Sequence, residues 1–136
     1  MYKVKGIIIV MVAVAAYFTI LLSQVQGHGQ GFDTYDRQHF VETRSQDMPI
    51  LLGPELTLVA VEYEEPKTYV RHIRVETWDL THAIMKIPQR EMDAVAKESV
   101  MQENYPILLA YDFEAIKFVM YNPAGDLIFK TQAEIQ

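Results

Sequence analysis

The chain has 136 residues, of which 50% are hydrophobic and 22% are charged, with a formal net charge of −6 and no cysteine. This length allows one folded domain, and the hydrophobic fraction is too high for a disordered chain. The acidic balance argues against nucleic-acid binding, and the lack of cysteine excludes disulfide scaffolds, thiolate metal sites and cysteine catalysis.

An apolar run over residues 7–22 lies near the N-terminus. A membrane-spanning helix needs about 20 apolar residues, and residues 4–25 reach that length when interfacial polar residues are included. Lys3 and Lys5 precede the run, whereas no basic residue follows it closely, which favours a cytoplasmic N-terminus. The sequence therefore predicts a single-pass membrane anchor over residues 1–25, with the rest of the chain outside the cytoplasm, in a bacterial periplasm.

A cleaved signal peptide is the alternative, since Val25-Gln26-Gly27 is a weak match to a small-residue cleavage site. Both alternatives export residues 28–136. Removing Lys3 and Lys5 from the 12 basic residues leaves 10 against 18 acidic residues, so the exported part has a net charge of −8. Anionic lipid headgroups repel a domain with this charge, and we expect it to stand off the membrane surface.

Cleavage after Gly27 would make His28 the first residue of the mature chain. A His-Gly start resembles that of copper monooxygenases of the histidine-brace type, in which the N-terminal amine and imidazole bind one copper ion. The resemblance covers two residues and implies a secreted copper-binding protein or enzyme with its metal at His28. It also implies a second histidine ligand, for which the chain offers His39, His72 and His82.

Residues 26–48 are rich in Gly, Gln, Asp, Thr and Ser, with scattered apolar residues. This composition is typical of a linker or an irregular lead-in. We therefore expect the folded extracytoplasmic domain to cover residues 49–136.

Two β-strands are predicted at the start of this domain. Residues 56–64 are enriched in β-branched and aromatic side chains, which favours a strand. A turn that contains proline follows, because proline cannot donate to a strand ladder. Residues 68–78 predict the returning strand of a hairpin, on which His72, Arg74 and Trp78 share one face.

One amphipathic helix is predicted in the middle of the domain. Residues 81–87 are ambiguous between a short strand and a helical lead-in, and Pro88 suits the first position of a helix that ends near Asn104. One stripe of this helix is small and mostly apolar: Met92, Val95, Ala96, Ser99 and Val100. Charged residues face away from the stripe: Glu91, Lys97 and Glu98.

Three further strands are predicted over residues 107–111, 115–121 and 127–130. The last two form a hairpin in which Gly125 takes a left-handed conformation. The element order is ββ(β)αβββ. The predicted fold is α+β, a small antiparallel sheet with one packed helix, behind an N-terminal transmembrane helix.

Familiar catalytic and metal-binding motifs are absent from the sequence, including G-x-S-x-G, H-E-x-x-H and a phosphate loop. The sequence therefore predicts no catalytic residue and no cofactor, and it favours a function other than catalysis. We expect an accessory protein that binds a membrane protein complex or another membrane-anchored protein. The expected contact residues follow the enrichment of Trp and Arg at binding hot spots, with a strand neighbour and an aromatic residue at a turn: Trp78, His72, Arg74 and Phe113.

Overall fold

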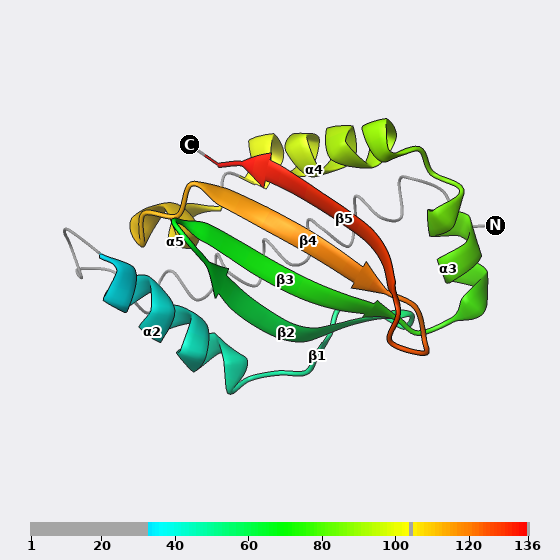
Figure 1. Ribbon diagram of the computed structural model, residues 1–136, viewed down its shortest axis with the longest axis horizontal. Helices are drawn as coiled ribbons and strands as arrows, with labels where there is room; N and C mark the ends of the chain where they lie inside the picture. The colour runs from blue at the N-terminus through cyan, green and yellow to red at the C-terminus, as the bar shows by residue number, and fades with distance from the viewer. Residues whose placement is uncertain (1–32, 104, 136) are drawn as a thin grey trace.

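The computed structural model describes residues 33–103 and 105–135 of the chain (Figure 1). The predicted anchor over residues 1–25, the alternative cleavage site and His28 lie outside the described residues. Within the described ranges, each helix is too short or too polar to span a bilayer.

The described residues form a five-stranded sheet with packed helices, so the predicted α+β class is confirmed. The elements in chain order are α2 (Thr34–Ser45), β1 (Ile50–Leu51), β2 (Leu56–Glu64), β3 (Thr68–Val75), α3 (Trp78–Met85), α4 (Gln89–Glu103), α5 (Pro106–Ala110), β4 (Ala115–Tyr121) and β5 (Leu127–Glu134).

The strands follow one another across the sheet in the order β1-β2-β3-β4-β5. Every neighbouring pair is antiparallel except β3 and β4, which are parallel. The expectation of a wholly antiparallel sheet is therefore wrong. A parallel pair needs a crossover connection of a dozen or more residues, and the chain supplies it by running through α3, α4 and α5 between β3 and β4.

Helix α2 replaces most of the linker that the composition predicts. Asp33 caps it: the Asp36 N–H donates to the Asp33 carboxylate and the Asp33 N–H donates to the Asp36 carboxylate, both at 3.0 Å. Phe40 and Val41 are buried against the sheet. The apolar stripe consists of little more than these two residues, which is why hydrophobic periodicity does not reveal this helix.

Strand β3 is shorter than predicted, because Thr77 begins a helix. The Thr77 hydroxyl accepts a hydrogen bond from the Leu80 N–H at 3.3 Å, which caps the first turn of α3. Leu80 and Ile84 are buried at helical spacing. The ambiguous stretch over residues 81–87 is therefore helical as far as Met85, and Trp78 lies in α3 rather than on β3.

Helix α4 confirms the predicted amphipathic helix, since all five residues of its apolar stripe are buried and Glu91, Lys97 and Glu98 are exposed. The strand predicted over residues 107–111 is wrong. Residues 107–110 instead belong to the short helix α5, which has Pro106 at its first position, and residue 111 starts the turn after it. A short apolar run fits a buried strand or a buried helix equally well, which explains the error.

The last hairpin is confirmed, and Gly125 has a φ of 91° as expected for its left-handed position. Strand β5 extends to Glu134, beyond the predicted end at residue 130, because buried and exposed residues keep alternating through Thr131 and Ala133.

The helices pack on one face of the sheet. The Phe40 ring of α2 lies 5.9 Å from the Tyr69 ring of β3, and the Thr131 hydroxyl of β5 donates to Asp93 of α4 at 2.7 Å. Figure 1 shows α2 beside β2, α4 beside β5, and α3 beyond the C-terminal end of β3. We call the opposite side of the sheet, which no described helix covers, the open face; His72 and Lys117 lie on it.

Candidate functional site

A shallow cleft of about 240 Å³ lies on the open face. We call it the sheet cleft. Only strand residues line it, and they come from four of the five strands: Glu62, Glu64, Val70, His72, Lys117, Val119, Tyr121, Leu127 and Lys130. Val70 and Val119 are almost fully buried and form an apolar floor between the polar side chains.

His72 is the centre of a hydrogen-bonded group in the sheet cleft. Its Nε2 lies 2.8 Å from the Glu62 carboxylate and its Nδ1 lies 2.7 Å from the Tyr121 hydroxyl. A neutral ring with its proton on Nε2 donates to Glu62 and accepts from Tyr121. Burial raises the pKa of Tyr121, and the negative charge of Glu62 adds to this effect. The Tyr121 hydroxyl therefore keeps its proton, and whether it donates to Nδ1 or accepts from it follows from the tautomer of His72.

Lys117 forms the second polar group of the sheet cleft. Its ammonium donates to both carboxylate oxygens of Glu64, at 2.7 and 2.8 Å. The two acidic residues on β2 thus each have a partner on another strand: Glu62 contacts His72 on the adjacent β3, and Glu64 contacts Lys117 on β4. The cleft is polar without a strong excess of one charge.

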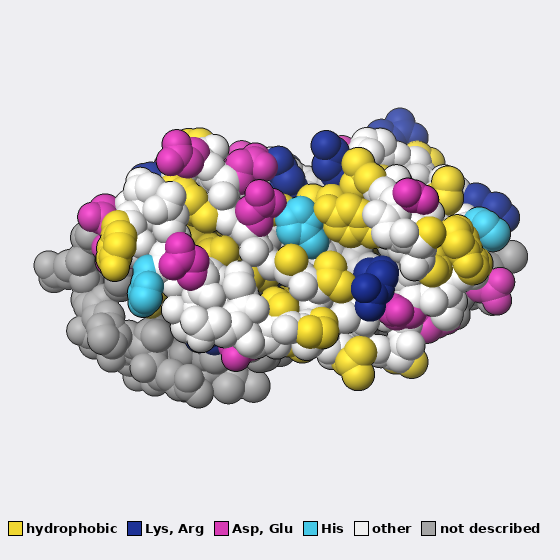
Figure 2. Space-filling model, turned by 60° about the horizontal axis from the view of Figure 1, so that its bottom comes forward, with side chains coloured by type: hydrophobic (Ala, Val, Ile, Leu, Met, Phe, Trp, Pro, Cys, Tyr) yellow, Lys and Arg dark blue, Asp and Glu magenta, His cyan; other side chains and the backbone are white. Residues whose placement is uncertain are grey.

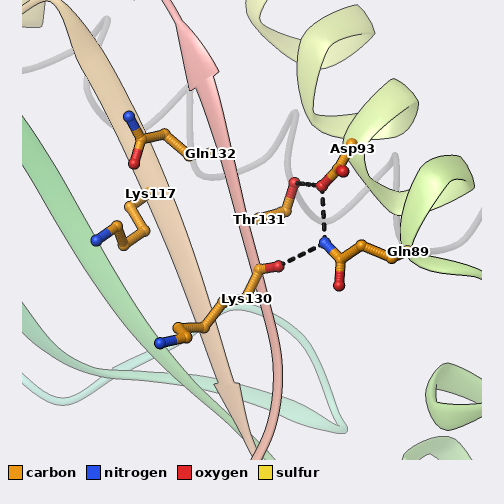
Figure 3. A pocket seen from close by; sticks show the side chains of 6 residues that line it. All are labelled: Gln89, Asp93, Lys117, Lys130, Thr131 and Gln132. Carbon is orange, nitrogen blue, oxygen red and sulfur yellow. Dashed lines mark hydrogen bonds between the residues drawn. The ribbon is translucent and has the colours of Figure 1, made fainter.

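A larger groove of about 440 Å³ runs along β5. We call it the edge groove. It is lined by residues of α4, β4 and β5: Gln89, Asp93, Lys117, Lys130, Thr131 and Gln132. The Gln89 amide donates to the Asp93 carboxylate and to the Lys130 carbonyl, both at 2.8 Å (Figure 3). Lys117 and Lys130 line both hollows, so the two are neighbours across β5.

The described residues contain no group of three or more His, Asp or Glu side chains that could hold a metal ion. His28 lies outside them, so the copper hypothesis stays a prediction. What the two hollows offer is hydrogen-bond donors and acceptors on a rigid sheet, an arrangement that suits binding of a polar ligand or a polypeptide.

The structure separates the residues that were expected to form one contact surface. His72 and Arg74 lie on β3, and the Arg74 guanidinium donates to Glu76 at 2.7 Å. That charged hydrogen bond lowers the pKa of Glu76. Trp78 does not share their strand, because α3 begins there. His72 and Arg74 share a strand face as expected, but the expectation that Trp78 lies on the same face is wrong.

Phe113 is a correction, because it is fully buried and not an exposed contact residue. Its ring packs edge-on against the Tyr69 ring at 5.5 Å. Asp112 has a φ of 63°, and this turn directs the next side chain into the core. The charged neighbours Asp112 and Glu114 stay outside, where both pair with Lys67 at 2.8 and 3.7 Å. The sequence predicts an exposed Phe113 because these two charged residues flank it.

Helix α3 presents three exposed residues at helical spacing: Trp78, His82 and Met85. We call them the α3 stripe. Trp78 is 50% exposed and Met85 is 61% exposed, and the Trp78 and His82 ring centroids lie 6.1 Å apart. On the face that Figure 2 shows, hydrophobic side chains are interspersed with charged residues and histidines.

Arg71 is a buried residue that sequence reasoning missed. It is fully buried on the helix-packed face, and its guanidinium lies 5.1 Å from the Tyr69 ring and 5.2 Å from the Tyr105 ring. Burial lowers the pKa of Arg71, and the two tyrosines oppose this effect. Strand alternation contains the signal, because Arg71 falls between Tyr69 and Ile73 on the inward side.

No protein-family model matches the sequence, and a search of curated proteins finds no match. Among solved structures, the chain is similar to a Pseudomonas aeruginosa protein thought to be secreted, with a TM-score of 0.54, 10% identity, and coverage of 76% of this chain and 94% of that one. It is also similar to EpsS, a pilotin from the type II secretion system of Vibrio vulnificus, with a TM-score of 0.50, 13% identity, and coverage of 71% and 83%. At these identities the likeness establishes the fold alone.

Proposed function

We propose that this chain is an exported, envelope-associated accessory protein whose folded domain binds a partner protein. The α3 stripe supports this most directly. A tryptophan that is half exposed on a well-packed helix resembles the rigid aromatic anchors at the centre of many protein interfaces. The fold likeness to EpsS, a protein of a type II secretion system, agrees with a role within a larger assembly.

Export is the part of the proposal that rests on the sequence. The apolar run over residues 7–22, with Lys3 and Lys5 before it, directs the rest of the chain out of the cytoplasm whether or not it is cleaved. An alkaline phosphatase fused to the C-terminus should be active, since this enzyme needs an oxidising compartment. An inactive fusion of normal abundance would exclude export. Recovery of a soluble chain that begins at His28 would exclude the anchor but not export.

Partner binding is tested by site-specific photo-crosslinking in living cells. A photoreactive residue in place of Trp78 should form a crosslink to one defined protein. The same residue in place of Glu98, which is exposed on α4, is the matched control and should give little or none. Equal crosslinking to many proteins from both positions would show that the α3 stripe is ordinary surface.

A further inference from the structure

Strand β5 forms one border of the sheet, and its contacts show which of its backbone N–H and C=O groups point away from β4. In an antiparallel pair, facing residues alternate between pairs that exchange two hydrogen bonds and pairs that exchange none. Lys130 faces Val119 of β4. Its carbonyl accepts a hydrogen bond from the Gln89 side chain at 2.8 Å, so this carbonyl points away from β4. The alternation then directs the N–H and C=O groups of Lys130, Gln132 and Glu134 outward.

Other contacts agree with this phase. The Ile135 N–H donates inward to the Glu114 carbonyl at 2.9 Å, as an odd-numbered residue should. Within the described part of the chain, the Gln89 amide is the one group that bonds to the outward row. The border of β5 therefore offers a row of backbone donors and acceptors that another strand can use.

The edge groove lies beside this row, between β5 and the first turns of α4 (Figure 3). The Gln89 amide bonds to the Lys130 carbonyl in the way that the N–H of an added strand would. Asp93 holds Gln89 in this position at 2.8 Å. The groove thus has the geometry for strand addition, in which main-chain hydrogen bonds give affinity and alternate side chains give specificity.

The charges at this border select one kind of strand. Lys117 and Lys130 line the groove, and Lys117 is paired with Glu64 in the sheet cleft. Lys130 is exposed and has no carboxylate partner among the described residues. A carboxylate on an added strand, on the open-face side and opposite Lys130, would supply that partner.

We propose that the outer edge of β5 binds an extended segment of a partner protein, which adds a sixth strand and places a carboxylate next to Lys130. This inference rests on the proposed function, because it specifies how the partner is bound. A second copy of this chain fits less well, since α4 runs along the same border (Figure 1) and a dimer would bring two such helices together. An extended segment adds only one strand spacing, about 4.8 Å.

The probe is a seven-residue peptide of alternating threonine and valine with a central glutamate in place of valine and with blocked ends. Titrated into the folded protein, it should slow hydrogen exchange of the Gln132 and Glu134 amides. We expect it to bind about tenfold more tightly than the same peptide with a central lysine, from the value of charge complementarity at an interface. A peptide with N-methylated backbone nitrogens should not bind.

Two variants of Gln132 separate the contribution of its backbone N–H to peptide binding from that of its side chain. Gln132→Pro removes an outward N–H, which an edge strand tolerates, and should weaken binding about tenfold. Gln132→Thr keeps the N–H and should bind as the wild type does. Equal binding by both, with both folded by circular dichroism, would overturn the proposal. So would peptide-induced changes confined to His72 and Tyr121 on the open face.

Two further outcomes would show that the edge of β5 binds a second copy of this chain or binds no strand. A concentration-dependent dimer that Gln132→Pro dissociates would assign the edge to a second copy and overturn the proposal. No peptide binding at any concentration would show that Gln89 and Lys130 only protect the edge from aggregation. If crosslinking at Trp78 still captures one partner in that case, the proposed function holds and the strand-addition mode alone fails.

Discussion

His72 links three strands of the open face through its two ring nitrogens. Tyr121→Phe removes the hydroxyl that forms a hydrogen bond with Nδ1 and leaves the ring packing in place. We expect a loss of about 0.5–1.5 kcal/mol in the free energy of unfolding, the usual net value of one hydrogen bond. Urea denaturation at pH 7 measures this loss, with Tyr35→Phe, at a tyrosine that is 71% exposed on α2, as the control. An unchanged midpoint would show that water replaces the Tyr121 hydroxyl fully.

The sequence identifies some of these side chains but not their partners. Strand alternation places His72 and Arg74 on one face correctly. It does not tell that Glu62 and Tyr121, from two other strands, meet at His72, because that contact depends on strand order and register. Phe113 shows the opposite limit: one left-handed residue, Asp112, reverses the direction of the side chain after it.

Helix α2 depends on its N-terminal cap, and this dependence is sensitive to pH. The N–H of Asp36 lowers the pKa of the Asp33 carboxyl, so the charged cap stabilises the fold above the ordinary pKa. That stabilisation is lost as the pH falls through the lowered value. Asp33→Asn keeps a capping side chain without the charge, so it should reduce the loss of stability between pH 4 and pH 2, which urea midpoints would detect. An unaltered pH profile would show that ionisation of Asp33 does not contribute to the free energy of unfolding.

Two substitutions in helix α4 test which side of this helix packs against the sheet. Val95 is buried against the sheet and Lys97 is exposed. Val95→Asp places an unpaired carboxylate in the core, and we expect it to cost about 3 kcal/mol or more, which unfolds a marginal domain. Lys97→Asp should change the free energy of unfolding by about 0.5 kcal/mol or less. Equal effects in thermal denaturation would contradict the packing of α4.

The elements differ in how strongly the sequence specifies them. Helix α4 and strands β2 and β4 have long, regular patterns, and their predicted bounds match those observed within one or two residues. Helix α2 has a narrow apolar stripe, and α5 is a five-residue apolar run whose local pattern does not distinguish helix from strand. In both, a pair of side chains is buried in the common core: Phe40 and Val41 in α2, Ile107 and Leu108 in α5.

At the scale of the whole molecule, the crossover from β3 to β4 decides what the surface offers. It carries α3, α4 and α5 to one side of the sheet, leaves the open face to the strands, and places the α3 stripe at the end of the sheet. Nothing in the local patterns distinguishes this parallel pairing from an antiparallel one, since both satisfy the same buried residues. Trp78 remains the proposed anchor for the partner, although it lies on helix α3 and not on a strand.

The claim that the folded domain binds a partner is tested most directly by the mass of the full-length chain taken from its native membranes in mild detergent. We expect one defined complex with one other protein. Trp78→Ala should dissociate it and leave the domain folded, whereas Met101→Ala, which removes a side chain 75% exposed on α4, should not. A full-length chain that migrates alone, with both variants indistinguishable from the wild type, would contradict the account.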